Sequence, residues 1–302
     1  MYLEHFGLGE APFSLTPDTH FFISSGCHQE ALNTLLVAIA GGEGFIKITG
    51  EVGTGKSILC RKFLASLDPD AYTTAYIPNP QFDPQTLQYA LAEELKMPIG
   101  EDVNRHQLLS ALTMHLMEIA RSGKGAVLCI DEAQAMPLET LEALRLLTNL
   151  ETEKRKLLQV VLFGQPELDQ KLSQESVRQI NQRITFQYRL RLLTEEETRY
   201  YVNQRLSIAG YRGEEPFGSD AVKKLYKASR GVPRLINIIA HKSLMLCYGK
   251  GRHKVDAAMV DMAAEDTPSV WQAKRDARWK WWVLGALALA GMGGFMAWVL
   301  AP

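Results

Sequence analysis

The sequence predicts an α/β protein with a parallel sheet flanked by helices, followed by a small all-helical domain. Two observations predict the sheet: a glycine-rich pattern between a strand and a helix, and short apolar segments that alternate with helical periodicity. A third observation, purely helical periodicity from Thr194 to Ala264, predicts the second domain. With 302 residues, 46% of them hydrophobic, the chain is long enough for two globular units.

The composition limits the possible classes of protein. A net charge of −1 provides no overall attraction to nucleic acid. The amino terminus lacks a positive segment followed by an apolar block, so no cleavable signal peptide is expected. The four cysteines Cys27, Cys60, Cys129 and Cys247 have no paired spacing, so no metal site is expected among them. Cys60 and Cys129 fall inside apolar helix and strand patterns, so we expect these two to be small buried residues in a reducing compartment.

The first 25 residues are rich in aromatic side chains. Pro12 and Pro17 disfavour a long helix there. The phenylalanines expected to pack as an arm on the α/β domain are Phe6, Phe13, Phe21 and Phe22. Leucine and isoleucine spacing then predicts an amphipathic helix from His28 to Ala40, which Gly41 and Gly42 end.

The next segment carries the pattern G-x-x-x-x-G-K-[ST] over residues 50–57. A strand at Phe45–Ile48 precedes it, and a helix follows from Lys56 to about Leu67. The glycines allow successive N–H groups to point at an anion, and the helix adds the positive end of its dipole. We expect the Lys56 amine to reach the β- and γ-phosphates of a nucleotide and the Ser57 hydroxyl to bind Mg²⁺.

The alternative to this phosphate loop is a glycine-rich turn with a lysine present by chance. The strand before the pattern and the helix after it favour nucleotide binding. The residues expected to hold the nucleotide are Gly50, Glu51, Val52, Gly53, Thr54, Gly55, Lys56, Ser57 and Ile58.

A central strand is predicted after two further helices. A short strand at Ala71–Ile77 and helices at Pro84–Lys96 and His106–Arg121 come first. The apolar run Ala126–Ile130 is typical of a parallel strand buried on both faces. A helix after Pro137, a strand at Leu157–Phe163, a polar helix at about Glu167–Asn181 and a strand at Ile184–Leu193 complete a doubly wound α/β domain.

Two acids follow the central strand. A phosphate-loop NTPase needs an acid at the tip of a neighbouring strand to hold Mg²⁺, and Asp131 suits this role. The adjacent Glu132 carboxylate can orient and deprotonate the attacking water, which predicts hydrolysis as well as binding. A solvated pair of charges at a strand end is the alternative, and the phosphate loop upstream favours the catalytic interpretation.

Three further positions are candidates for contact with the nucleotide. Gln165 follows the strand at Leu157–Phe163, so its amide could touch the γ-phosphate or the water. Arg183 or Arg178 could project into a neighbouring subunit's site and stabilise transition-state charge. The sequence leaves open which arginine does so, and a role in solubility is the alternative for both. Arg234, at the start of a lid helix, could couple lid movement to nucleotide state.

The carboxyl-terminal part predicts a membrane anchor. Thr194 is a helix N-cap with acids in the first turn, and it opens a lid domain over residues 194–266, after an α/β domain over 1–193. A basic tether over 267–280 leads to Trp281–Leu300, about 20 uncharged residues that can span the ~30 Å core of a bilayer. The basic flank predicts that the preceding domains face the cytoplasm. A buried helix is the alternative, which the length and flanks disfavour.

These residues carry a resemblance to a known family. The ordered set GEVGTGKS, LCIDEAQ, EALRLLTNLE, VLFGQPEL, RQINQRITF and GVPRLIN resembles AAA+ ATPases of the general secretion pathway protein A type, over about residues 1–265. The opening MYLEHFGL…PFSLTPDTHFF and the later IPNP resemble the M proteins of MSHA (mannose-sensitive haemagglutinin) type IV pilus biogenesis. The resemblance implies an AAA+ P-loop core with a helical lid, ATP hydrolysis with Mg²⁺, and dimer or ring assembly. It also implies work at the inner membrane on an envelope-spanning pilus or secretion machine.

The resemblance also implies roles by position. Lys56 and Ser57 match the phosphate-loop pair, and Asp131 and Glu132 match the Mg²⁺ and water acids. Gln165 falls at the first sensor, Arg183 at the finger, Arg234 at the second sensor, and His28 in the segment that flanks the adenine. Gln165 departs from the usual Asn, Thr or Ser. Family members continue past the membrane helix into a peptidoglycan-binding domain. The resemblance covers only about residues 1–265, so it does not imply that this chain contacts the cell wall.

The expected function is therefore that of a membrane-anchored ATPase that assembles a pilus or secretion complex. A nucleotide-controlled DNA-binding adaptor is an alternative, because related AAA+ ATPases serve transposition. The membrane helix and the lack of a basic stripe disfavour it, since Lys223, Lys224 and Lys227 suit a solvated helix face. A scaffold that binds ATP without hydrolysing it is a third possibility, against which Glu132 argues.

Overall fold

The computed structural model describes residues 2–24, 26–98, 105–151 and 155–268. The chain divides into two compact units. Of the described residues, one unit holds Thr16–Leu192, and the other holds residues 2–15 together with residues 193–268. The chain therefore passes between the units twice.

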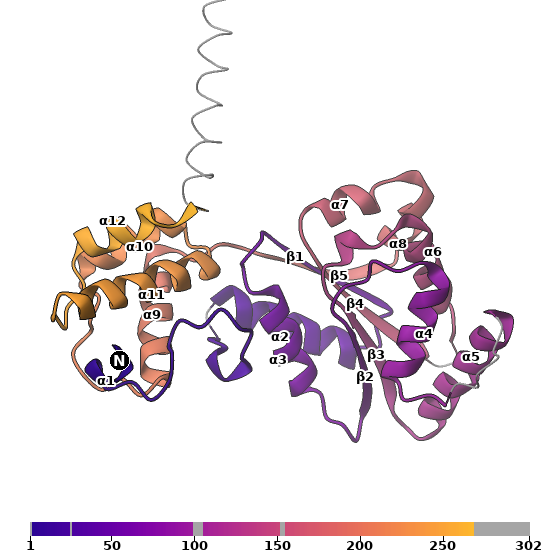
Figure 1. Cartoon of the computed structure of the whole chain (residues 1–302). Coiled ribbons are helices and arrows are strands. Elements are labelled where there is room, and N and C mark those ends of the chain that lie inside the picture. Colours follow the sequence, from indigo (N-terminus) through magenta and orange to yellow (C-terminus); the bar gives the residue numbers. More distant parts are fainter. Residues whose placement is uncertain (1, 25, 99–104, 152–154, 269–302) are drawn as a thin grey trace, which may run out of the picture. The chain divides into compact units, whose positions relative to one another are not determined.

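The first unit is built on a five-stranded parallel sheet (Figure 1). Its strands are β1 (Phe45–Gly50), β2 (Tyr72–Ile77), β3 (Gly125–Ile130), β4 (Leu158–Gly164) and β5 (Ile184–Leu190). Their order across the sheet is β2-β3-β4-β1-β5. The expectation that the acids leave a strand next to the phosphate-loop strand is wrong, because β4 pairs with both β1 and β3 and lies between them.

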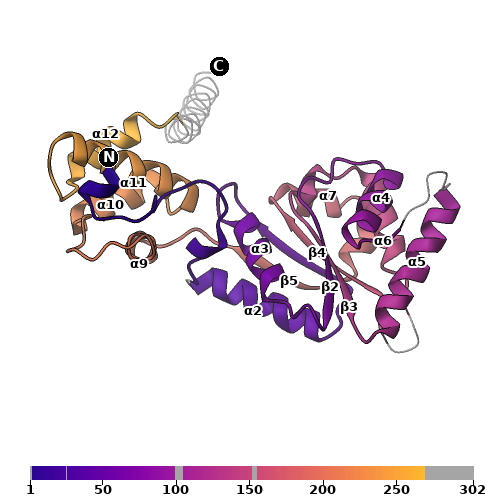
Figure 2. The ribbon, with the colours of Figure 1, turned by 60° about the horizontal axis from the view of Figure 1, so that its bottom comes forward.

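Helices cover both faces of the sheet, which gives three layers (Figure 2). One face packs against α2 (Gly26–Ala40) and α3 (Lys56–Ser66). The helices on the other face are α4 (Pro84–Glu94), α5 (Arg105–Arg121), α6 (Leu138–Leu147), α7 (Glu167–Leu172) and α8 (Arg178–Asn181). Short 3₁₀ turns η1 (Thr19–Phe21), η2 (Ala133–Ala135) and η3 (Glu175–Val177) complete the unit.

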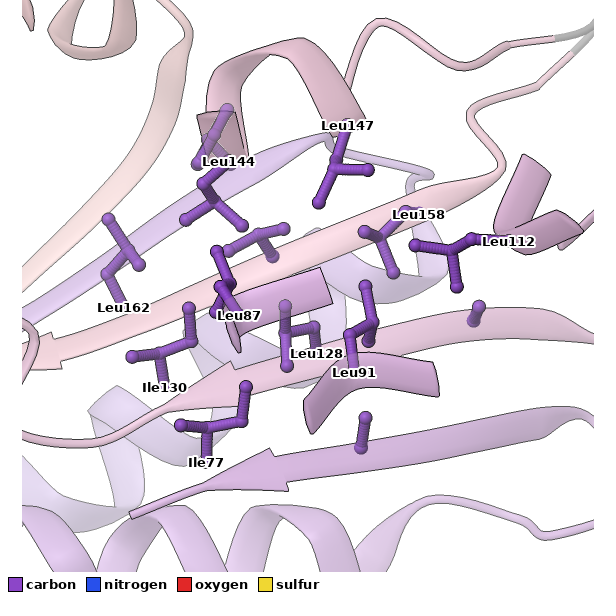
Figure 3. Packing of buried hydrophobic residues seen from close by; sticks show 14 of the residues in the cluster. Ile77, Leu87, Leu91, Leu112, Leu128, Ile130, Leu144, Leu147, Leu158 and Leu162 are labelled. Carbon is purple, nitrogen blue, oxygen red and sulfur yellow. The ribbon is translucent and has the colours of Figure 1, made fainter. Parts of the chain in front are cut away.

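The central strands supply side chains to both cores. In β3, Leu128 and Ile130 face one core, and Val127 and Cys129 face the other. Figure 3 shows Leu128 and Ile130 among leucines of α4, α5 and α6. Burying each such side chain stabilises the fold by about 1.5–3 kcal/mol, so both faces of the apolar run contribute. This packing holds the carboxyl ends of β1, β3 and β4 at one edge of the sheet.

The polar helix predicted at Glu167–Asn181 is wrong as one element, because it forms α7, η3 and α8 in succession. Each residue of a helix advances by about 100°, so a continuous helix would put Val177 about half a turn away from Leu168. Both side chains are fully buried in the same core. The interruptions between α7, η3 and α8 turn the Val177 side chain back into the core.

The second unit is helical. Its main helices are α9 (Glu195–Ile208), α10 (Ser219–Ser229), α11 (Pro233–Gly249) and α12 (Ala257–Glu265). The Thr194 side chain accepts a hydrogen bond from the Glu197 N–H at 3.2 Å, and the Glu197 carboxylate accepts one from the Thr194 N–H at 2.9 Å. This capping box confirms Thr194 as the N-cap of α9.

The amino-terminal segment differs from the expected arm, because its first part belongs to the helical unit. Phe13 packs edge-on against Phe217 at 6.2 Å between ring centroids. The Arg205 guanidinium donates to the Pro12 carbonyl and to the Ser14 carbonyl. These contacts, with the short helix α1 (Tyr2–His5) beside α11, hold residues 2–15 on the helical unit.

Within the described residues, no helix is both long and apolar enough to cross a membrane. The segment Trp281–Leu300 lies outside the described residues, as does most of the tether over 267–280. The membrane helix therefore stays a prediction.

Candidate functional site

The glycine-rich loop joins the end of β1 to the start of α3. Gly53 and Gly55 have φ angles of 79° and 96°, in the left-handed region that favours glycine. A side chain at Gly50 would meet the Thr54 Oγ1 at 2.9 Å and the Leu190 Cβ at 3.0 Å. The Thr54 side chain and Leu190 of the neighbouring strand therefore leave no room for a side chain at Gly50.

The Lys56 amine is enclosed by this loop. It donates to the carbonyls of Gly50 at 2.8 Å and Glu51 at 3.0 Å, and the residue is only 5% exposed. Burial lowers the pKa of Lys56, and the carboxylates of Glu132 and Asp131 oppose that shift. The loop thus holds a cation next to two acids from another strand, as the phosphate-loop prediction requires.

Asp131 follows β3 and is nearly fully buried. Burial raises the pKa of Asp131, and a hydrogen bond from the Ser57 side chain opposes the shift. Its Oδ1 also accepts from the Glu132 N–H at 2.9 Å. A hydroxyl and a carboxylate in contact are the hard oxygen ligands that Mg²⁺ prefers, so Ser57 and Asp131 fit the predicted metal site.

Glu132 has a left-handed backbone, with φ 52° and ψ 38°. Its Oε2 accepts hydrogen bonds from the side-chain amides of Gln165, at 3.0 Å, and Gln134. Burial raises the pKa of Glu132, but the two amides and the Lys56 charge outweigh burial and hold that pKa below its usual value. The carboxylate is therefore ionised and fixed in direction.

Gln165 reaches Glu132 because its strand, β4, lies between β1 and β3. The structure thus brings Gln165 together with the two acids and Lys56. Gln134 was missed by the sequence reasoning, although it stands two residues after Glu132 in the quoted motif LCIDEAQ. This short spacing from the acids is the feature of the sequence that could have indicated a role for Gln134 in the site.

His28 is buried beneath the loop. Its Nε2 lies 2.8 Å from the Thr54 carbonyl, so this nitrogen carries the proton and donates. A side chain at Gly55 would come within 3.0 Å of the same nitrogen. His28 therefore supports the loop backbone directly, and its predicted place beside the adenine stays a prediction.

Arg183 lies at the end of the sheet opposite the loop, and Arg178 lies five residues before it in the chain. Arg183 immediately precedes β5, which runs parallel to β1, and Arg178 begins α8. The 7 residues of β5 rise about 3.3 Å each, so they span about 23 Å between the two edges. The exposed Arg183 guanidinium donates to the Asn149 Oδ1. Neither arginine can reach the loop of its own chain.

Arg234 belongs to the helical unit and lies exposed in the first turn of α11. The turn before it is held by Gly231, whose carbonyl accepts from the Leu193 N–H at 3.0 Å. The role of Arg234 as second sensor stays a prediction.

Comparisons with known proteins agree with this geometry. Residues 39–172 match the family described as AAA domain. The chain is 39% identical over 288 residues to General secretion pathway protein A of Aeromonas hydrophila. That match covers 95% of this chain and 52% of the relative, so the chain spans about half the length of the curated relative it matches.

Solved structures share the fold. The ORC2 protein of Aeropyrum pernix, in its ADPNP–ADP complexes, has a TM-score of 0.62 at 16% identity, covering 85% of this chain and 71% of its own. Cdc6p of Pyrobaculum aerophilum has a TM-score of 0.59 at 18% identity, covering 81% and 67%. The RuvB Holliday junction branch migration motor of Thermotoga maritima has a TM-score of 0.53 at 17% identity, covering 79% and 67%. At these identities the likeness shows an AAA+ α/β fold with a helical lid.

Proposed function

Because the chain carries an AAA domain and is related to General secretion pathway protein A over 95% of its length, we propose that it is a membrane-anchored ATPase. It uses ATP binding and hydrolysis to assemble a type II secretion complex or an MSHA-type type IV pilus at the inner membrane. The observation that carries hydrolysis is the meeting of Lys56, Asp131 and Glu132 at the carboxyl edge of the sheet.

The residues divide the chemistry among them. The loop N–H groups and the Lys56 amine bind the phosphates, and the Ser57 hydroxyl and the Asp131 carboxylate would hold Mg²⁺. Bound Mg²⁺ would neutralise charge on the phosphate oxygens. Glu132, kept ionised and fixed by two amides, orients a water and accepts its proton. Gln165 has a second amide hydrogen that can reach the γ-phosphate or the water.

Self-association completes the site in this proposal. Because Arg183 lies at the far end of the sheet, with Arg178 five residues before it in the chain, a finger from either of them can act only on a neighbouring subunit. Arg183 is the better candidate, since the Asn149 side chain orients its guanidinium at the surface. A guanidinium delivered in this way would stabilise charge in the transition state and make hydrolysis depend on assembly.

The membrane setting rests on the sequence of Trp281–Leu300. The secretion role rests on the relation to General secretion pathway protein A. Its partners would be inner-membrane proteins of a secretion or pilus complex. The geometry favours no second candidate function.

Steady-state phosphate release from detergent-extracted full-length protein tests the proposal. Wild-type protein should release phosphate at least about 100-fold faster than Glu132→Gln, because a general base contributes about 10²–10⁴ to the rate. Wild-type rates no higher than those of Glu132→Gln would favour a scaffold that binds ATP. Envelope proteins that co-purify with Glu132→Gln in the presence of ATP would identify the complex, and co-purification of DNA-binding partners alone would count against it.

A further inference from the structure

Gln134 lies at the centre of a closed set of hydrogen bonds. Its side-chain amide donates to the Glu132 Oε2, and its Oε1 accepts from the Gln165 main-chain N–H at 3.0 Å. The Gln165 side-chain amide also donates a hydrogen bond to the same Glu132 oxygen, at 3.0 Å. Gln134, in the η2 turn that follows β3, therefore joins the Glu132 carboxylate to the main chain at the end of β4.

The surroundings keep Gln134 in this position. The Lys171 amine, on α7, donates at 2.6 Å to the main-chain carbonyls of both Gln134 and Met136, which fixes the η2 turn. Gly164 leaves room for the side chain, since a Cβ there would lie 3.3 Å from the Gln134 Oε1 and 2.7 Å from the Leu168 Cδ2. An ordinary solvated glutamine would need neither arrangement.

We propose that Gln134 is a positioning residue that holds the Glu132 carboxylate and the Gln165 backbone as one unit. A shift of the β4 end then carries the carboxylate with it, and a phosphate contact made by Gln165 changes where the base points. This inference rests on the proposed hydrolytic function, but the contact itself can be measured without nucleotide.

Hydrogen–deuterium exchange of the nucleotide-free full chain, resolved at single residues, tests the contact. Gln134→Leu removes the acceptor for the Gln165 N–H, so that amide should exchange about 5-fold faster, as expected for the loss of one hydrogen bond. Gln134→Met, of similar length, is the second variant. Exposed Gln170 on α7 provides the matched control, since Gln170→Leu should leave the Gln165 rate unchanged. Unchanged exchange in both Gln134 variants would overturn the proposal.

Kinetics separate positioning from a structural role. In single turnovers with Mg²⁺ and ATP, Gln134→Leu should slow hydrolysis about 10- to 100-fold and change the ATP dissociation constant less than about 2-fold. In the Glu132→Gln background the same change should slow the residual rate less than about 2-fold, because the group it positions is gone. An equal factor in both backgrounds would refute positioning. If wild type hydrolyses no faster than Glu132→Gln, the proposed function fails, and the exchange result still decides whether the contact exists.

Discussion

Replacing Gly231 by alanine should destabilise the helical unit by about 2–5 kcal/mol. Gly231 has φ +75°, and an alanine pays about 1–2 kcal/mol for the left-handed conformation. Its Cβ would also lie 2.0 Å from the Leu193 carbonyl oxygen and 2.9 Å from the Leu193 carbonyl carbon. Both are backbone atoms, so the chain must shift at a further cost of about 1–3 kcal/mol.

Two other glycines of the same unit separate the cost of the left-handed backbone from the cost of the steric clash. Gly251 has φ +62° but nothing within 4 Å of an added Cβ, so Gly251→Ala should cost only the conformational part, about 1 kcal/mol. Gly249, the last residue of α11, has neither a positive φ nor a neighbour within 4 Å. Gly249→Ala should therefore be neutral or slightly stabilising, by up to about 0.5 kcal/mol.

Hydrogen exchange of the full chain measures these differences locally. Amides of α9 to α12 should lose most protection in Gly231→Ala and less in Gly251→Ala. In Gly249→Ala their protection should be unchanged or slightly higher, and amides of the sheet provide the internal reference. For a domain of 60–100 residues, 1 kcal/mol shifts the melting temperature by about 4–8 °C, so Gly231→Ala should lower it by at least about 8 °C. A Gly231→Ala protein that behaves like Gly249→Ala would refute the packing argument.

The remaining predictions concern the nucleotide site. Lys56→Ala should weaken ATP binding by about 10- to 150-fold in calorimetry, because it removes a charged contact worth about 1.5–3 kcal/mol, and unchanged affinity would mean that the loop is misassigned. Arg183→Ala should slow phosphate release and spare ATP binding, and mixing it with Lys56→Ala subunits should restore activity; no recovery would argue against a finger between subunits. His28→Leu should weaken ATP binding about 5-fold through loss of its bond to the Thr54 carbonyl, and an affinity equal to wild type would show that the loop holds its shape alone. Chelation of Mg²⁺ should abolish phosphate release, with excess Mg²⁺ restoring it; release that continues in the chelator would contradict the Ser57 and Asp131 site.

The parts of the site that are local in sequence could be predicted from it. The phosphate loop and the acids Asp131 and Glu132 each lie within a few residues of a recognisable strand, and residue spacing alone indicates their chemistry. The N-cap at Thr194 could be predicted for the same reason, since a capping box depends on residues three apart.

The parts of the site that depend on the order of the strands could not be predicted from the sequence. Alternating strands and helices predict a parallel sheet, but they do not say that β4 enters between β1 and β3. Only that order brings Gln165 to Glu132, and only the η2 turn aims Gln134 at both. The sequence also could not predict that residues 1–25 are divided between the two units. Phenylalanines such as Phe13 and Phe21 have similar sequence surroundings but pack into different units.

The double passage of the chain between its two units affects how the protein is made. A ribosome releases the amino-terminal segment first, yet its partners Phe217 and Arg205 emerge only after the whole of Thr16–Leu192. At 5–20 residues per second, roughly 180 residues take roughly 10–40 s to synthesise. During that interval Phe6 and Phe13 have no core to enter, whereas the sheet can already close. Residues 2–15 therefore reach their packing partners late, and a bulky tag fused before them would burden the helical unit.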